Sequence, residues 1–221
     1  QQSPRLAGVI SDYERALKQR NSLLKSRAPE SSLRSWSEHL ATFGGEVIAG
    51  RIKLINEIEP LFQIAYKNLS AKKLAKLGYK SSIPAPSSEK EVNRELMLKV
   101  IEEVKSQEIE RGISLVGPHR DDLILNLGDH PVKGYASHGE SWSIALALRL
   151  ASYQLFINEG AKPILILDDV FSELDEGRRE KLLEIADSAE QTFITVAVEN
   201  DLPKAIQGAR FKVELGKVVT L

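Results

Sequence analysis

Cysteine is absent from the 221-residue sequence, which excludes disulfide bridges and thiolate metal sites and fits a reducing compartment. The four histidines lie far apart and predict no metal-ligand cluster. No segment approaches the roughly 18 consecutive apolar residues of a membrane-spanning helix. The N-terminal Gln1-Gln2-Ser3-Pro4 also lacks the basic and then apolar layout of a secretory signal. We therefore expect a cytoplasmic protein that does not bind membranes.

The remaining composition is that of an ordinary folded protein, with 42% hydrophobic and 28% charged residues and no visible internal repeat. The net charge of −1 hides an asymmetry. Residues 1–107 carry 18 Lys and Arg against 12 Asp and Glu, whereas residues 108–221 carry 12 against 19. The first half is therefore the better candidate for a nucleic-acid surface.

Five lysines of this half lie between Pro60 and Ser88, a stretch that contains no acidic residue: Lys67, Lys72, Lys73, Lys76 and Lys80. Such a group of positive charges is suited to binding nucleic-acid phosphates. A solvated helix end followed by a lysine-rich loop explains the same pattern without any ligand. The sequence leaves both interpretations open.

Apolar residues recur at helical spacing through the first half. The pattern predicts a helix over residues 10–25 and a longer helical segment over residues 33–69, interrupted by Gly44-Gly45 and Pro60, where kinks are expected. These segments are typical of an antiparallel helical arm.

A third helix is predicted after the breaker segment that precedes it. Ser88 and Glu91 have the spacing of a capping box, and the helix is expected to end near Gln107. The first half is therefore predicted to be all helical, as an arm domain of residues 1–110.

From Gly112 the apolar periodicity becomes that of strands alternating with helices, with a turn at Gly128-Asp129. The predicted strands are residues 113–116, 123–127, 132–135, 163–167, 192–198, 211–215 and 218–221, and the predicted helices are residues 141–158 and 177–189. This alternation predicts an α/β sheet with helices packed on it, so residues 111–221 are assigned to an α/β lobe.

The strongest chemical signal is the aliphatic strand that ends in Asp168 and Asp169 and is followed by residues 172–175, Ser-Glu-Leu-Asp. The C-terminal tip of a parallel strand faces the crevice where ligands bind, and a carboxylate there can hold Mg²⁺ against nucleotide phosphates. The neighbouring acid can then position or deprotonate an attacking water. A plain strand end followed by a helix cap is the alternative interpretation.

A second signal is the loop Ala136–Ser141, which leads directly into a long predicted helix. Small residues before a helix N-terminus present backbone N–H groups and the positive end of the helix dipole to an anion. Ser and Glu at such a position are also ordinary capping residues. The order of the loop, one helix and then the acidic strand strengthens the phosphate interpretation.

In this order, the motifs resemble those of the C-terminal lobe of ABC-type ATPases. Their amino-acid sequences are similar to those of RecF proteins, especially actinobacterial ones. The matching stretches are residues 13–21 (YERALKQRN), 117–122 (GPHRDD), 133–143 and 164–175. The resemblance covers essentially the whole chain. It implies an α/β protein with a helical, lever-arm-like domain followed by the C-terminal lobe of an ABC-type ATPase sheet.

The resemblance also implies roles for the two acids at the strand end. Asp168 resembles the Walker B acid that holds Mg²⁺. Asp169 stands where many ABC ATPases carry the catalytic Glu, and the shorter side chain puts fast hydrolysis in doubt.

Further roles are implied around the loop. Ser137 and Gly139, with Glu140, resemble the signature motif that contacts the γ-phosphate of ATP bound by the other protomer. His138 replaces the usual small residue of that motif, a second departure from the pattern of fast hydrolysis. Asp175 resembles the D-loop acid that bridges the two sites of the dimer.

RecF proteins bind ATP, dimerise around it and bind single- and double-stranded DNA together with RecR and RecO. They help to place RecA on gapped strands in recombinational repair, in replication-fork maintenance and in the SOS response. The resemblance therefore implies an ATP- and Mg²⁺-dependent DNA-binding homodimer whose full-length form is a slow, DNA-stimulated ATPase.

One family motif is absent. The phosphate-binding pattern GxxxxGK(S/T) does not occur, and Gly216-Lys217 is followed by Val218. The family carries this P-loop upstream of the motif at Tyr13, so we expect the chain to be a C-terminal fragment. Such a fragment should bind ATP weakly, should not hydrolyse it, and should self-associate through uncovered apolar surface and exposed sheet edges.

Two hypotheses from other classes stay open. The chain could be an adaptor module that binds a protein partner without nucleotide, or a metal-dependent phosphatase or nuclease using Asp168, Asp169 and Asp121. Within residues 117–122, Arg120 is expected either to bind phosphate or DNA or to fix a turn by pairing with Asp. Trp36 and Trp142 are expected to pack in the core or the arm rather than stack on bases.

Overall fold

The computed structural model describes residues 4–70, 73–171, 174–198, 202 and 206–220. Its elements, in chain order, are α1 (Pro4–Lys25), α2 (Glu30–Leu69), β1 (Ala75–Lys80), α3 (Lys90–Arg111), β2 (Asp122–Leu127), β3 (His130–Pro131), α4 (His138–Asn158), β4 (Leu165–Asp168), α5 (Glu176–Ser188), β5 (Thr192–Thr195), β6 (Phe211–Glu214) and β7 (Lys217–Thr220). None of the described helices is long and apolar enough to cross a membrane.

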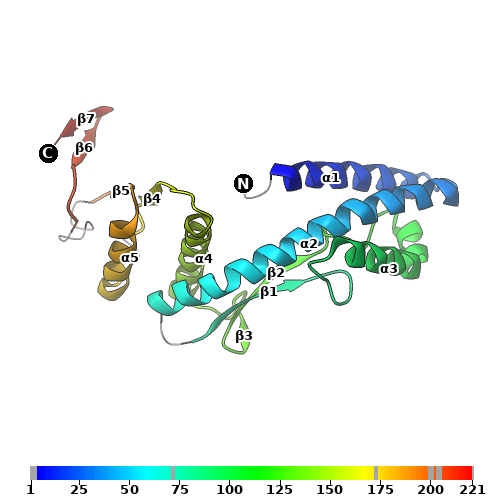
Figure 1. The fold of residues 1–221 in the computed structure, drawn as a ribbon, viewed down its shortest axis with the longest axis horizontal. Coiled ribbons are helices and arrows are strands. Elements are labelled where there is room, and N and C mark those ends of the chain that lie inside the picture. Colours follow the sequence, from blue (N-terminus) through cyan, green and yellow to red (C-terminus); the bar gives the residue numbers. More distant parts are fainter. Residues whose placement is uncertain (1–3, 71–72, 172–173, 199–201, 203–205, 221) are drawn as a thin grey trace.

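The helical arm is built on α2, which continues through Gly44-Gly45 and Pro60 as one 40-residue element. Helix α1 lies antiparallel beside it, and α3 packs on the same part of α2 (Figure 1). The two glycines permit this packing, because a Cβ on Gly45 would lie 2.6 Å from the carbonyl oxygen of Lys90 and one on Gly44 would lie 2.7 Å from the Met97 sulfur. Their role is close helix approach rather than interruption of the helix.

The prediction that the first half is all helical is wrong, because it contains β1. This strand pairs antiparallel with β2, from Ala75 opposite Leu127 to Lys80 opposite Asp122. Ala75 and Leu77 are buried and the lysine between them is exposed, which is the period-two pattern of a half-buried strand. Because β1 joins the predicted arm to the predicted lobe, the division at residue 110 stays a prediction.

The capping box predicted for the third helix is also wrong. Glu89, not Ser88, is the residue before α3, and it makes no capping hydrogen bond with its side chain. The side-chain oxygen of Asn93 instead accepts a hydrogen bond from the Ser87 N–H at 2.8 Å, and its amide donates to the Ser87 carbonyl at 2.7 Å. A buried asparagine thus holds the segment entering the helix, which then continues to Arg111 rather than ending near residue 107.

In the second half, the two long helices, the antiparallel partner strand β2 and the closing hairpin β6–β7 are confirmed within a few residues. Strands β4 and β5 pair in parallel, as an α/β lobe requires. Two predicted strands are wrong. Residues 113–116 form a loop that side chains hold, and residues 132–135 form a turn in which the N–H groups of Tyr135 and Ala136 donate to the Val132 carbonyl.

Two clusters of buried side chains hold the molecule together, and α2 contributes to both. The first joins α1, α2 and α3 with Val116, and the second joins the C-terminal half of α2 with β1, β2, α4, β4 and α5. Trp36 and Trp142 are partly buried against these clusters, consistent with packing roles. One continuous helix therefore runs from the arm into the lobe.

Candidate functional site

Asp168 and Asp169 stand at the C-terminal end of β4, beside the end of β5. The Thr195 hydroxyl donates a hydrogen bond to the Asp168 carboxylate, and the Asp169 N–H donates to the Thr195 carbonyl at 3.1 Å. Asp169 has a φ of +51°, in the left-handed region that Asp tolerates better than most residues. Its carboxylate accepts from the Ala197 N–H at 3.4 Å. The backbone thus turns sharply after Asp168.

The alternation of β4 explains why these acids are accessible. Leu165 and Leu167 point into the core, whereas Ile166 and Asp168 point to the opposite face and are exposed. On β5, Phe193 is 52% exposed on that face and lies opposite Ile166 in the parallel pair. The acids therefore lie at the rim of a sheet face that the described residues leave uncovered.

The residues at this strand end fit a magnesium ion completed by nucleotide phosphates. Mg²⁺ in nucleotide sites is usually held by one or two carboxylates together with phosphate oxygens and water. Asp168 supplies such a carboxylate and the Thr195 hydroxyl orients it. Within the described part of the chain, no group of three or more His, Cys, Asp or Glu side chains gathers that could hold a metal by itself.

The phosphatase or nuclease hypothesis required Asp121 to join these acids, and the structure places it elsewhere. Its carboxylate accepts hydrogen bonds from the Tyr79 hydroxyl at 2.5 Å and from the Ser82 N–H at 2.7 Å. Arg120 donates to the Ser114 carbonyl at 3.0 Å rather than pairing with an Asp. Residues 117–122 therefore fix a loop against the arm.

Ser137 is the N-cap of α4 and forms a full capping box with Glu140. The Glu140 N–H donates to the Ser137 hydroxyl at 3.3 Å, and the Ser137 N–H donates to the Glu140 carboxylate at 2.9 Å. The capping interpretation is therefore correct for these two side chains. The N–H groups of His138 and Gly139 belong to the first helical turn, which offers no intrahelical acceptor, and both residues are exposed.

Glu140 also forms an ion pair with Lys73, whose ammonium lies 2.8 Å from the carboxylate. This hydrogen bond, followed by those from Ser137, lowers the pKa of Glu140 to about 2. Lys73 thus neutralises the one acidic side chain in the first turn of α4. A negative charge next to a helix N-terminus that binds phosphate would otherwise repel the phosphate.

Asp175 is the N-cap of α5, and its carboxylate accepts from the Arg178 N–H at 3.0 Å. The Arg178 Nε lies 3.4 Å from the other carboxylate oxygen and donates to the Leu69 carbonyl at 3.1 Å. A Cβ on Gly139 would lie 3.9 Å from the Arg178 guanidinium. Ser172 and Glu173, the first half of the Ser-Glu-Leu-Asp turn, lie outside the described residues.

The predicted site residues thus fall into two groups. In the first, Arg178 binds Asp175 and the end of α2 and lies beside Gly139, and Lys73 pairs with Glu140. In the second, Thr195 holds Asp168 and Asp169. These three linking residues were missed as site residues. Lys73 had been noticed only as part of a lysine-rich stretch, and the position of Thr195 depends on the β4–β5 register, which no local pattern predicts.

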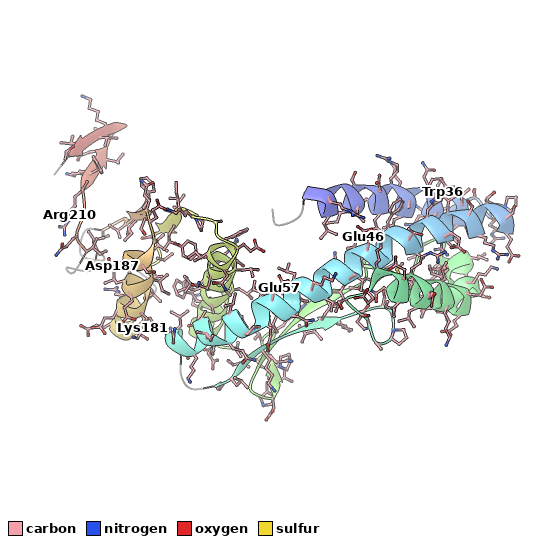
Figure 2. The ribbon with its side chains drawn as sticks, in the orientation of Figure 1. Trp36, Glu46, Glu57, Lys181, Asp187 and Arg210 are labelled. Carbon is pink, nitrogen blue, oxygen red and sulfur yellow. The ribbon has the colours of Figure 1, made fainter. Side chains whose placement is uncertain are left out.

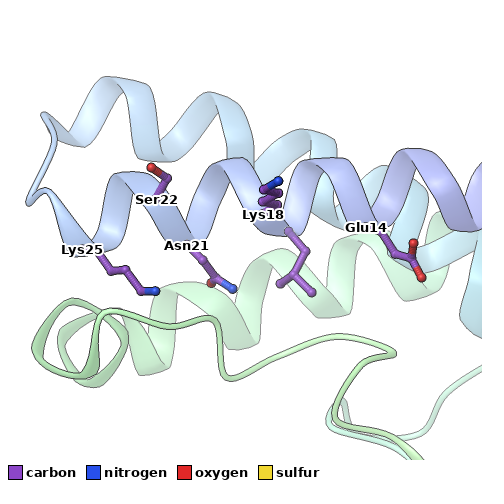
Figure 3. Close-up of a pocket in the computed structure, with 6 residues that line it drawn as sticks. Glu14, Lys18, Asn21, Ser22 and Lys25 are labelled. Atoms are coloured by element: carbon purple, nitrogen blue, oxygen red, sulfur yellow. The ribbon is translucent and has the colours of Figure 1, made fainter.

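A surface hollow lies away from both groups. It runs along α1 and is lined by Glu14, Leu17, Lys18, Asn21, Ser22 and Lys25 (Figure 3). None of the predicted site residues lines it, so it is not the candidate site.

No protein-family model matches the chain. It is 49% identical to the DNA replication and repair protein RecF of Streptomyces avermitilis over 98% of this chain, and 46% identical to that of Beutenbergia cavernae over 99%. The chain belongs to the RecF family. It spans 61% and 64% of the lengths of these two RecF proteins.

The RecF fold is confirmed by a solved structure, that of the recombination mediator protein RecF with ATP in the RecFOR pathway. It superposes with a TM-score of 0.83 at 25% identity, covering 99% of this chain and 59% of that one. The predicted α/β fold class with its helical arm is therefore correct.

Proposed function

We propose that this chain is part of an ATP-dependent DNA-binding protein of DNA replication and recombinational repair, which dimerises around ATP. The names of its relatives and the ATP in the RecF structure it superposes on support this proposal. The observation that carries it is that one lobe contains two suitable surfaces. One is the acidic end of a parallel strand, and the other is the exposed start of α4, where Lys73 neutralises the charge of Glu140.

Each group has a distinct task in this proposal. Asp168, oriented by Thr195, holds Mg²⁺, and Asp169 positions the attacking water. Bound ATP and Mg²⁺ supply the phosphoryl group and most of the charge that neutralises it. The N–H groups at the start of α4 bind the γ-phosphate held by the partner protomer, with Gly139 allowing close approach.

DNA is assigned to the basic half of the chain. Lys76 and Lys80 are exposed on β1 and point to the same face, and Lys67 is exposed near the end of α2. Lys73 is already paired with Glu140, and Lys72 lies outside the described residues. The full-length protein is proposed to act with RecR and RecO in placing RecA on gapped DNA, and its hydrolysis is proposed to be slow and to act as a switch.

The test is ATP-dependent dimerisation of the full-length protein, measured by light scattering together with ATP binding. Ser137→Arg adds a bulky side chain at the start of α4 and should abolish dimerisation while ATP binding survives. Gln154→Arg adds the same side chain at an exposed site on the same helix and should behave as wild type. Normal dimerisation of Ser137→Arg would mean that the loop only caps the helix, and a wild type that binds no ATP would favour the adaptor hypothesis.

A further inference from the structure

Three segments that are distant in the sequence meet at Arg178. It belongs to the first turn of α5, it donates to the carbonyl of Leu69 at 3.1 Å, and its guanidinium borders Gly139. Leu69 is the last residue of α2, where carbonyl groups lack intrahelical donors and the helix dipole is negative. A guanidinium is well suited to this position because it carries both the donor and the positive charge.

A second contact joins the segment that follows α2 to the start of α4. Lys73 lies shortly after the end of α2, and its ammonium binds Glu140 at 2.8 Å. Arg178 thus ties the end of α2 to α5 beside the start of α4, and Lys73 ties the segment that follows α2 to the start of α4. The Arg178 side chain at this junction is only 22% exposed.

Helix α2 carries Lys67, one of the proposed DNA-binding residues, two residues before Leu69. It is one element of 40 residues whose side chains belong to the core of the arm and to the core of the lobe. A displacement of α2 along its axis relative to α5 would change the position of the Leu69 carbonyl relative to Arg178. Coupling between distant sites requires a contiguous physical link of this kind, whose position both sites can influence.

We propose that Arg178 is a positioning residue that couples the end of α2 to the loop at the start of α4, so that DNA held by the exposed lysines of α2 and β1 strengthens ATP-dependent dimerisation. This inference rests on the proposed function and adds to it the route between the DNA-binding half and the nucleotide interface. Lys73 is the second, weaker link of the same junction, since its side chain is more exposed than that of Arg178.

The experiment uses the full-length protein and measures the fold by which DNA lowers the protein concentration needed for half-maximal dimerisation in ATP. Arg178→Gln should reduce this ratio about tenfold, within the range usual for coupled sites. The control is Lys181→Gln, which removes a charge from the same helix. Lys181, labelled in Figure 2, is exposed and pairs with Glu184, so its loss should leave the ratio unchanged. Arg178→Lys should retain part of the ratio, because an ammonium can still donate to the Leu69 carbonyl.

A second measurement tests the coupling from the DNA side, on variants whose circular dichroism and ATP binding match those of the wild type. Linkage requires ATP to raise DNA affinity by the same factor by which DNA strengthens ATP-dependent assembly, so Arg178→Gln should lose both effects equally. The double variant Lys73→Gln/Arg178→Gln should lose less coupling free energy than the two single variants together, as expected for residues of one shared junction. If Arg178→Gln keeps the wild-type ratio, the inference is wrong while the proposed function stands; a wild type that does not dimerise with ATP overturns both.

Discussion

The arm and the lobe use similar polar residues in opposite surroundings. In the arm, the side chains of Arg20 and Glu108 are 3% and 0% exposed, and they pair at 2.5 Å. Arg20 also donates to the hydroxyls of Ser37 and Ser114 at 2.9 and 2.7 Å. In the lobe, Lys73 pairs with Glu140 at the surface, where the lysine is 53% exposed.

The degree of burial determines whether a charged pair holds the fold together or stays free to bind a ligand. A buried ion pair is weak evidence of net stabilisation, but removing one partner leaves an uncompensated charge in a medium of low dielectric constant. Among the described residues, no buried side-chain nitrogen or oxygen lacks a hydrogen-bond partner. The arm network therefore locks helices together, whereas the exposed groups of the lobe can exchange water for phosphate at little cost.

The largest expected effect comes from breaking the buried pair of the arm. Glu108→Gln keeps the shape of the side chain but leaves the Arg20 charge without its partner. We expect a loss of about 3–5 kcal/mol in the free energy of unfolding. Urea denaturation followed by circular dichroism measures this loss.

The matched control is a surface pair in the same arm. Arg15 and Asp12 lie 3.5 Å apart with side chains 71% and 46% exposed. Asp12→Asn should change the free energy of unfolding by no more than about 1 kcal/mol, as is usual for exposed pairs. Equal losses in the two variants would show that burial does not distinguish the two regions.

A smaller effect is expected at the crossing of α2 and α3. A Cβ on Gly45 would meet backbone atoms of α3, the Lys90 carbonyl oxygen at 2.6 Å and the Arg94 nitrogen at 2.8 Å. Because backbone cannot rotate aside, Gly45→Ala should cost about 1–3 kcal/mol of stability. Gly8→Ala, in α1 with no atom within 4 Å of its Cβ, should instead stabilise by about 0.5–1 kcal/mol. Thermal unfolding of both variants tests the pair, and an unchanged or raised stability of Gly45→Ala would show that the contact with α3 does not require a glycine there.

Local periodicity predicted most of the fold, and non-local pairing accounts for what it missed. The helical arm and the acidic strand have strong patterns within single segments. Strand β1 was overlooked because its partner β2 lies beyond α3, although Ala75 and Leu77 alternate with exposed residues. Residues 113–116 had a strand-like pattern, yet side chains such as Asn21, which accepts from the Ser114 N–H at 2.7 Å, hold them as a loop.

The same division applies to the candidate site. The motif residues can be found from spacing, because Asp168 and Ser137 stand at element ends that the sequence marks. Their partners Thr195 and Lys73 cannot, since each depends on how two elements pack. Residues that act on the site only by holding another side chain can therefore be identified from the folded structure but not from local sequence patterns.

The smallest expected effect lies at the exposed pair of the lobe and is a change in titration. Lys73, and then Ser137, hold the pKa of Glu140 at about 2, below its ordinary value. Because the pKa is lower in the folded state, the carboxylate stabilises the fold above its unfolded-state pKa, and this contribution is lost as the pH falls towards 2. Lys73→Met should raise the pKa of Glu140 but not fully restore it, since the Ser137 N–H still donates to the carboxylate. Carbon-detected NMR titration of Glu140 measures the midpoint, and Lys162→Met, which removes the distant surface pair with Glu190, should leave it unchanged. An unchanged midpoint in Lys73→Met would mean that the capping box alone sets this pKa, so that the lobe, like the arm, relies on hydrogen bonds within its own fold.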